Sequence, residues 1–546
     1  MNPVRTRQPS TLPFAPRETA LRFRAGRSEA SLTIGGPAPR TPAEWLQAAE
    51  ERPVDPERRA ALLRELGPHW GRLDLPEAAR RSRERLEDPA TRIVVAGQQP
   101  ALWGGPLMLA VKALAAIRTA RRLEETGIPA VPIFWVASED HDVDELWGGL
   151  VPHGSSGGIE LVPPFPRGRR MLGTLRFEQP MEARIAAVAP LLEGAPAEVE
   201  PLYRNSLADG PAEEFVRLLL GLFGGDGLLP VRPEWLRTLS RPLILAELEA
   251  PGRLAAQVRE QIEALVAHDL PVPIPEPADL PFFWIDEGGA RHRVRIEGEG
   301  KVRIGGPSGG ERSIPELRDE IEANPERVSP DALLRPWVQD SILQPVATLL
   351  GPTELAYQWE LGEVYRSRGV PRPVLLPRPR VRVIDEEDAE RLEANGISID
   401  SLVPGIRAVD RIPSPRAARL AGELDDLAQP LIERIVAWAE DPENDPALRK
   451  RTDRLARRLR EDMEKLAAVL PERAAPDVAE ARREVGEILE RVFPGGREGE
   501  RSLALLGFLA RHGRAGLAAI ADVLEPGDGA IVTVVLGSER SGGTRE

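Results

Sequence analysis

The sequence contains no cysteine among its 546 residues. This absence excludes disulfide bonds, zinc sites with thiolate ligands and a cysteine nucleophile. No window approaches the roughly 18 uninterrupted apolar residues of a membrane-spanning helix, and the first residues lack the apolar segment of a secretory signal. We therefore expect a cytoplasmic protein that does not enter a membrane.

Lysine is also scarce, and acidic residues outnumber basic ones, 86 to 72. The formal net charge is −14, and the only lysines are Lys112, Lys301, Lys450 and Lys465. An acidic chain argues against nucleic acid or an anionic membrane as the main partner. The hydrophobic content of 42% is enough to form hydrophobic cores. The length suggests about three or four segments of domain size.

Residues 91–146 carry the most information about fold. An apolar run at 93–96 predicts a buried strand, a helical pattern extends through about residue 125, and a second apolar run follows at 131–137. The first run ends in a loop that reads GQQPALWGGP, and the second ends in SEDHD. This pattern predicts one βαβ unit with polar groups at the carboxyl end of each strand, where open α/β sheets bind their ligands.

The rest of the chain extends this core. We expect further buried strands at 227–231 and 373–376, helices at 42–64, 76–86, 212–223 and 233–268, and helical structure over 329–368. Alternation at 281–304 predicts antiparallel hairpins. We therefore expect an α/β core domain over residues 1–385, with insertions near 151–210 and 269–328. Residues 501–546 should return to the core, with a strand at 530–536 joining the main sheet.

Residues 386–500 differ in kind. Between 414 and 493 apolar residues recur with 4-3-4 and seven-residue spacing, and charged residues fill the gaps. This is typical of a coiled coil in three helical stretches with short turns. We expect the segment to make a homodimer; the alternative is an ordinary helical bundle packed on the main domain.

The glycine-rich loop is the first candidate site. Gly97, Gln98, Gln99, Gly104 and Gly105 lie between a strand and a helix, where glycines let the backbone approach a ligand and a helix N-terminus offers free N–H groups. The glutamine amides can bind polar ligands. The spacing matches neither GxGxxG nor a Walker loop, so it predicts no nucleotide. The alternative is a structural turn.

The SEDHD segment is the second candidate. His141 is suited to act as a general base near neutral pH, with Asp140 or Asp142 orienting it. Ser138 and Glu139 would contact the substrate. One histidine among adjacent carboxylates does not give separated metal ligands, so we expect no metal. The alternative is that one carboxylate caps a following helix.

A third group lies later in the chain. Arg335 has a planar fork suited to a carboxylate or phosphate. Gln339 follows it at helical spacing, and Glu354 begins a helical stretch that also carries Tyr357. We expect all four to bind substrate. An acidic residue in a first helical turn is also favourable without any function.

Taken together, these segments resemble the BshC family, the cysteine-adding enzymes of bacillithiol biosynthesis. The resemblance rests on AGQQPALWGGP, PIFWVASEDHDVDE, LLRPWVQDSILQPVATLLGPTELAYQWEL and PVLLPRPRV, in that order, and extends along the whole chain. It implies a Rossmann-like parallel sheet interrupted by connecting-peptide insertions, and a C-terminal coiled coil that makes a dimer. It also implies a ligase that joins L-cysteine to glucosaminyl malate.

Several positions depart from the family pattern: Ala101, Trp103, Asp331, Leu350 and Thr353. Thr353, beside Glu354, puts details of the substrate in doubt. Amide formation needs an activated carboxylate, so ATP or another nucleotide is the co-substrate we consider first, although the sequence does not identify it. Two alternatives remain at this stage: a sugar-nucleotide-dependent transferase, or a non-catalytic scaffold built on the coiled coil.

Overall fold

The computed structural model divides the chain into two compact units, residues 1–383 with 499–546, and residues 384–498. The residues it describes are 5–8, 39–146, 165, 168–268, 270–298, 300–307, 309–399, 402, 415–439, 451–452, 454–463, 465–466, 476–527, 529 and 531–537. The predicted turns of the coiled coil and part of the first predicted insertion lie outside these ranges.

A five-stranded parallel sheet forms the centre of the first unit. Its order is β11 (Val374–Pro377), β10 (Pro345–Leu350), β2 (Arg92–Gln98), β3 (Ala130–Val136) and β4 (Leu229–Val231). β3 is buried along its whole length, and so is most of β2. Burial on both faces explains their continuous apolar sequences. The strands predicted at 93–96, 131–137, 227–231 and 373–376 are confirmed.

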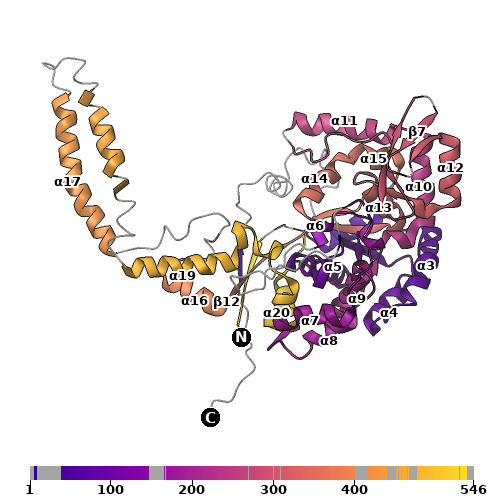
Figure 1. Ribbon diagram of the computed structural model, residues 1–546, viewed down its shortest axis with the longest axis horizontal. Coiled ribbons are helices and arrows are strands. Elements are labelled where there is room, and N and C mark those ends of the chain that lie inside the picture. Colours follow the sequence, from indigo (N-terminus) through magenta and orange to yellow (C-terminus); the bar gives the residue numbers. More distant parts are fainter. Residues whose placement is uncertain are drawn as a thin grey trace, which may run out of the picture. The chain divides into compact units, whose positions relative to one another are not determined.

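Helix α5 (Leu107–Glu125) connects β2 to β3 and packs against both (Figure 1). The chain then adds β4 beyond β3, whereas β10 and β11 are added on the other side of β2. The order of the strands therefore reverses between β2 and β10. In open α/β sheets, ligands bind at the carboxyl ends of the strands beside such a reversal.

Strand β10 corrects one prediction. We expected helical structure over 329–368, but residues Pro345–Leu350 form a strand between β2 and β11. All six residues are buried. A short apolar run that is buried on every side has no periodicity that distinguishes a strand from a helix. Because helical patterns flank it on both sides, the sequence pattern assigns the run to the same helical stretch.

The tail corrects a second prediction. β13 (Ile531–Leu536) is a strand, as expected, but it does not join the parallel sheet. It pairs with β1 (Arg5–Gln8) and lies between β1 and β12 (Arg380–Asp385) in a separate three-stranded sheet. All six residues of β13 are buried, so its apolar sequence indicates a strand but not the sheet that it joins.

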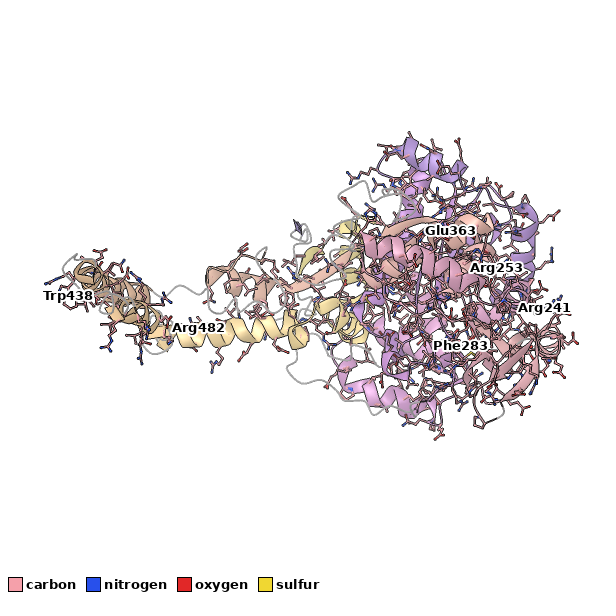
Figure 2. The ribbon with its side chains drawn as sticks, turned by 90° about the horizontal axis from the view of Figure 1, so that it is seen from above. Arg241, Arg253, Phe283, Glu363, Trp438 and Arg482 are labelled. Atoms are coloured by element: carbon pink, nitrogen blue, oxygen red, sulfur yellow. The ribbon has the colours of Figure 1, made fainter. Side chains whose placement is uncertain are left out.

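A five-stranded antiparallel sheet lies within the second predicted insertion. Its order is β8 (Gly310–Ser313), β7 (Lys301–Ile304), β6 (Arg291–Ile296), β5 (Phe282–Ile285) and β9 (Val328–Pro330). Phe283, labelled in Figure 2, lies beneath the guanidinium groups of Arg291 at 4.1 Å and Arg293 at 4.5 Å. The hairpins expected at 281–304 are confirmed.

Helices surround these sheets in the first unit. They are α2 (Pro42–Glu50), α3 (Pro56–Trp70), α4 (Glu77–Arg85), α6 (Val143–Leu146), α7 (Met181–Leu192), α8 (Val199–Ser206), α9 (Pro211–Phe223), α10 (Arg237–Glu249), α11 (Arg253–Ala267), α12 (Ile314–Ala323), α13 (Leu334–Leu343), α14 (Pro352–Glu360), α15 (Gly362–Arg368) and α20 (Leu505–Val523). α7 and α8 lie in a stretch whose many glycines and prolines gave few helical signals. Among the described residues, no helix is long and apolar enough to cross a membrane.

The second unit contains α16 (Glu386–Ala394), α17 (Pro415–Ala439) and α19 (Pro476–Val492), with further helical residues between 451 and 466. α19 buries Val485, Ile488 and Val492. By contrast, apolar side chains of α17 and of 451–466 remain exposed: Leu427, Leu431, Trp438, Leu455 and Leu466. Figure 2 marks Trp438 towards the end of α17. The coiled coil remains a prediction.

Candidate active site at the carboxyl edge of the parallel sheet

Lys112 lies at the centre of this edge, although the sequence analysis did not select it. Its side chain is 2% exposed. Its Nζ donates to Gly97 O at 2.9 Å, to Gln98 Oε1 at 2.7 Å and to Glu354 Oε1 and Oε2 at 3.1 and 3.0 Å. Burial lowers the pKa of Lys112, and Glu354 opposes that shift. The ammonium therefore joins the ends of β2 and β10.

Glu354 has two partners in this arrangement. Besides the Lys112 ammonium, its Oε2 accepts the backbone N–H of Gly351 at 2.6 Å, which caps the first turn of α14. Burial alone would raise the pKa of Glu354, but Lys112 and this N–H lower it below its usual value. The side chain remains 28% exposed, so the carboxylate can also contact a ligand.

The SEDHD segment divides into an inner and an outer part. Ser138 is fully buried and donates from Oγ to Glu234 Oε2 at 2.5 Å. Glu139 is also buried and pairs with Arg237. These two side chains, predicted to bind substrate, are occupied by contacts within the protein. Asp140, His141 and Asp142 form the outer part.

The outer residues line a cavity of about 410 Å³. Gln99 lies on its wall and donates from Nε2 to Asp140 Oδ2, so the β2 loop and the β3 loop meet there. The remaining lining residues are Val143, Asp144, Glu145 and Gly168. Burial raises the pKa of Glu145, and Asp142 and Asp140 add to the effect. A cavity with so many carboxylates favours a ligand with a positively charged group.

His141 lines the cavity and has a lowered pKa. Burial lowers the pKa of His141 below its usual 6.5, and nearby Arg291 lowers it further. The imidazole is therefore mostly neutral at pH 7. Among the described residues its Nδ1 has no hydrogen-bond partner.

Asp140 does not orient the ring in the way we expected. Its Oδ1 accepts the backbone N–H of His141 at 2.6 Å and lies 3.6 Å from His141 Nδ1, too far for a hydrogen bond. Asp140 therefore holds the backbone of His141 rather than its ring, and orientation of the ring by Asp142 stays a prediction.

Arg335 belongs to a chain of polar side chains behind α14. Its Nη2 donates to Tyr357 Oη at 2.9 Å and its Nη1 to Gln339 Oε1 at 3.2 Å. Gln339 is buried and donates from Nε2 to Asp340 Oδ1 at 3.1 Å, while Tyr365 donates to Asp340 Oδ2. Burial raises the pKa of Asp340 to about 6. Gln339, predicted to bind substrate, therefore holds Arg335.

Gly104 and Gly105 lie in a packed region. A Cβ on Gly104 would lie 2.7 Å from Leu505 Cδ2, and one on Gly105 would lie 2.5 Å from Ala101 Cβ. The N-terminus of α5 is also occupied, because Leu107 N donates to Leu503 O at 2.8 Å. The returning segment therefore occupies one of the amides that we expected to face a ligand, and a ligand contact at this loop stays a prediction. Packing accounts for both glycines.

The structure therefore brings Gly97, Gln98, Gln99, Asp140, His141 and Glu354 to one edge and adds Lys112 to them. Lys112 could have been found from sequence, since it is the only charged residue on the buried face of α5. Arg237 and Glu234 carried no such signal, because contacts far apart in the chain determine their burial. Within the part of the chain that the structure describes, no group of three or more side chains could hold a metal ion.

A parallel sheet with polar loops at the reversal of its strand order defines a Rossmann-like domain. Residues 38–379 match the family described as "Bacillithiol biosynthesis BshC, N-terminal Rossmann-like domain". A protein of Solibacter usitatus named "Putative cysteine ligase BshC" is 30% identical over 86% of this chain and 88% of its own length. A protein of Thermus thermophilus with the same name is 32% identical over 86% and 93%. The chain belongs to the BshC family.

Proposed function

We propose that this protein is a ligase that joins the carboxyl group of L-cysteine to the amino group of glucosaminyl malate, forming the amide of bacillithiol. The observation that carries the proposal is the acidic cavity with a neutral histidine on its wall. It supports binding of an amine substrate and removal of the proton that the amine must lose. The names of the relatives support the same reaction class.

The amine side of the reaction would use Asp140, Asp142 and His141. The two carboxylates would attract the ammonium form of the acceptor. His141, whose ring nitrogen has no partner among the described residues, would take a proton as the amine becomes a nucleophile. Gln99 would fix Asp140 for this task.

The cysteine side would use Arg335, Tyr357 and Glu354, which lie beyond the residues that line the acidic cavity. Arg335 and Tyr357, held together by a hydrogen bond, offer a guanidinium for the carboxylate of cysteine, and Glu354 offers a carboxylate for its ammonium. An α-amino acid carries both charges, so paired groups of opposite sign suit it. Gly97 and Gln98 would lie between the residues that bind the amine and those that bind cysteine.

The carboxylate of cysteine must be activated, because a carboxylate oxygen does not leave when an amine attacks. A nucleoside triphosphate such as ATP is the co-substrate that we propose, with transfer of a phosphoryl or nucleotidyl group to that oxygen. The sequence has no Walker loop, so a different arrangement of residues would hold the nucleotide.

The proposal includes a cytoplasmic location and a homodimer. The exposed leucines of α17 support the dimer, because a single chain leaves Leu427 76% exposed and Leu431 52% exposed. Apolar side chains repeated along one helix favour a second helical surface.

The test is complementation of a bacterial strain that lacks its own cysteine-adding enzyme. Expression of this chain should restore bacillithiol and remove accumulated glucosaminyl malate, both measured by mass spectrometry. His141→Ala should not restore the thiol, although its melting temperature should stay within a few degrees, since changes at partly exposed sites usually cost about 0.5 kcal/mol or less.

A matched control is His268→Ala, which changes a histidine outside the cavity lining. It should restore the thiol like the unchanged chain. Accumulation of glucosaminyl malate despite a folded, expressed chain would reject the proposed substrate. Full restoration by His141→Ala would remove His141 from the reaction.

A further inference from the structure

Lys112 is enclosed by the protein and uses every proton of its ammonium. Three acceptor groups surround Nζ: the Gly97 carbonyl, the Gln98 side chain and the Glu354 carboxylate. An ammonium carries three N–H donors, so none is left for a ligand. A side chain whose donors are all engaged in this way is not a nucleophile or a base, and its contribution to the site must pass through its partners.

Those partners come from the two sides of the strand-order reversal. Gly97 and Gln98 end β2, while Glu354 lies in the first turn after β10. β2 and β10 are direct neighbours in the sheet, but about 250 residues of chain separate their ends. Lys112 therefore joins two loops that local sequence alone does not hold together.

One partner leads to the lining of the acidic cavity, and the other leads to the Arg335–Tyr357 pair. Gln99, next to Gln98, donates to Asp140 beside His141. Glu354 caps α14 through the Gly351 N–H and lies one turn before Tyr357, the partner of Arg335. A change at Lys112 would therefore affect both the cavity lining around Asp140 and the Arg335–Tyr357 pair.

We propose that Lys112 is a positioning residue of this site: its buried ammonium links the end of β2 to the N-terminus of α14. It thereby holds the residues proposed to bind the amine at a fixed distance from those proposed to bind the amino acid. The identities of the two ligands rest on the proposed function. The structural role of Lys112 does not rest on the proposed function, and its test needs no substrate.

The test is amide hydrogen exchange in the full chain, with a change on one side of the link and a measurement on the other. Lys112→Met keeps an unbranched side chain of similar length and removes the donors. The Gly351 amide, which donates to Glu354, should then exchange at least about tenfold faster, the effect of losing one charge-assisted hydrogen bond. Glu354→Gln should likewise speed exchange at Ala137, whose amide bonds to Gln98 O at 2.9 Å.

Two further variants separate positioning from general stability. Lys112→Arg keeps a charged donor and should keep the slow exchange of Gly351. Lys301→Met changes a lysine on β7 whose side chain is 62% exposed, and should alter neither amide.

The proposal is overturned if folded Lys112→Met leaves exchange at Gly351 unchanged, or if exchange rises equally throughout the core. An arginine variant as fast as the methionine variant would also overturn it, because packing and not charge would then be responsible. If Lys112→Met does not fold, the Ala137 amide in Glu354→Gln decides: unchanged exchange there rejects the link.

Discussion

Glu360, at the end of α14, is a buried carboxyl group with no ion-pair partner among the residues that the structure describes. It is 0% exposed; its Oε1 accepts the Ile274 N–H at 3.0 Å, and its Oε2 has no hydrogen-bond partner among the described residues. Burial raises the pKa of Glu360 from its ordinary 4.5 to about 7. The protonated form is therefore the one that the fold accommodates.

This shift makes stability depend on pH. Because the folded pKa lies above the unfolded one, the contribution is fully present below about pH 4.5 and is lost as pH rises through about 7. Glu360→Gln should remove the loss, so the variant should be more stable than the unchanged chain at pH 8, by at most about 3 kcal/mol. At pH 4.5 the difference should nearly vanish.

Thermal unfolding at the two pH values measures this difference. Glu263→Gln on α11, an exposed position, is the control and should give the same difference at both. A Glu360→Gln variant whose advantage does not change between pH 4.5 and pH 8 would show that Glu360 is not protonated in the fold.

Gly104 is the second residue whose environment makes a definite prediction. It has φ +85°, and a Cβ would lie 2.7 Å from Leu505 Cδ2. Gly104→Ala should therefore lower the free energy of unfolding by about 1–3 kcal/mol, through backbone strain and overpacking. Gly67→Ala, in α3 with nothing within 4 Å of the new Cβ, should instead stabilise by up to about 1 kcal/mol.

Thermal unfolding of the two alanine variants provides the comparison, and ligand affinity provides the second readout. A Gly104→Ala chain with unchanged melting temperature but weaker cysteine binding would return this glycine to the ligand-contact role that the sequence suggested.

At the scale of elements, the returning segment at 499–504 is tied to the end of β11. Arg378 Nη1 lies 2.7 Å from Glu500 Oε1, and both side chains are 1% exposed. Glu500 Oε2 also accepts the Val381 N–H at 2.8 Å. Because removal of one partner leaves a buried charge uncompensated, Glu500→Ala should cost about 3–5 kcal/mol.

The double change Arg378→Met with Glu500→Leu tests that reason. It removes both charges and supplies apolar volume, so it should recover much of the loss. Chemical denaturation of the two variants gives the comparison. A double variant as unstable as Glu500→Ala would mean that the Val381 contact, and not the ion pair, carries the stability.

Elements with a local signal were predictable. The β2–α5–β3 unit could be predicted because two apolar runs, a helical periodicity and a glycine-rich loop all lie within one stretch of the chain. β10 could not, because its six buried residues have no polar face to set a period. The same distinction holds at the site. Gln99, Asp140 and His141 follow predictable strands, whereas Lys112 acquires its carboxylate partner, Glu354, only when α5 and α14 come together.

At the scale of the whole molecule, the second unit carries apolar residues that the chain itself leaves uncovered. Ile432 of α17 is 3% exposed, whereas Leu427 is 76% and Leu431 52% exposed. Among the described side chains of α17, Ile432 is therefore covered while Leu427 and Leu431 face outward, whereas α19 buries Val485, Ile488 and Val492. A second copy of the same surface, related by two-fold symmetry, would cover these leucines.

Leu427→Asp with Leu431→Asp should therefore separate a dimer without unfolding the chain. Each buried leucine contributes about 1.5–3 kcal/mol, and a two-fold interface contains every residue twice, so the dissociation constant should rise at least about a hundredfold. Analytical ultracentrifugation should show a dimer for the unchanged chain and a monomer for the variant, with similar melting temperatures because both positions are already exposed.

Ile432→Asp, at a covered position, should instead lower the melting temperature of the second unit. An unchanged chain that sediments as a monomer at micromolar concentration, or a variant that still sediments as a dimer, would reject α17 as the dimer surface.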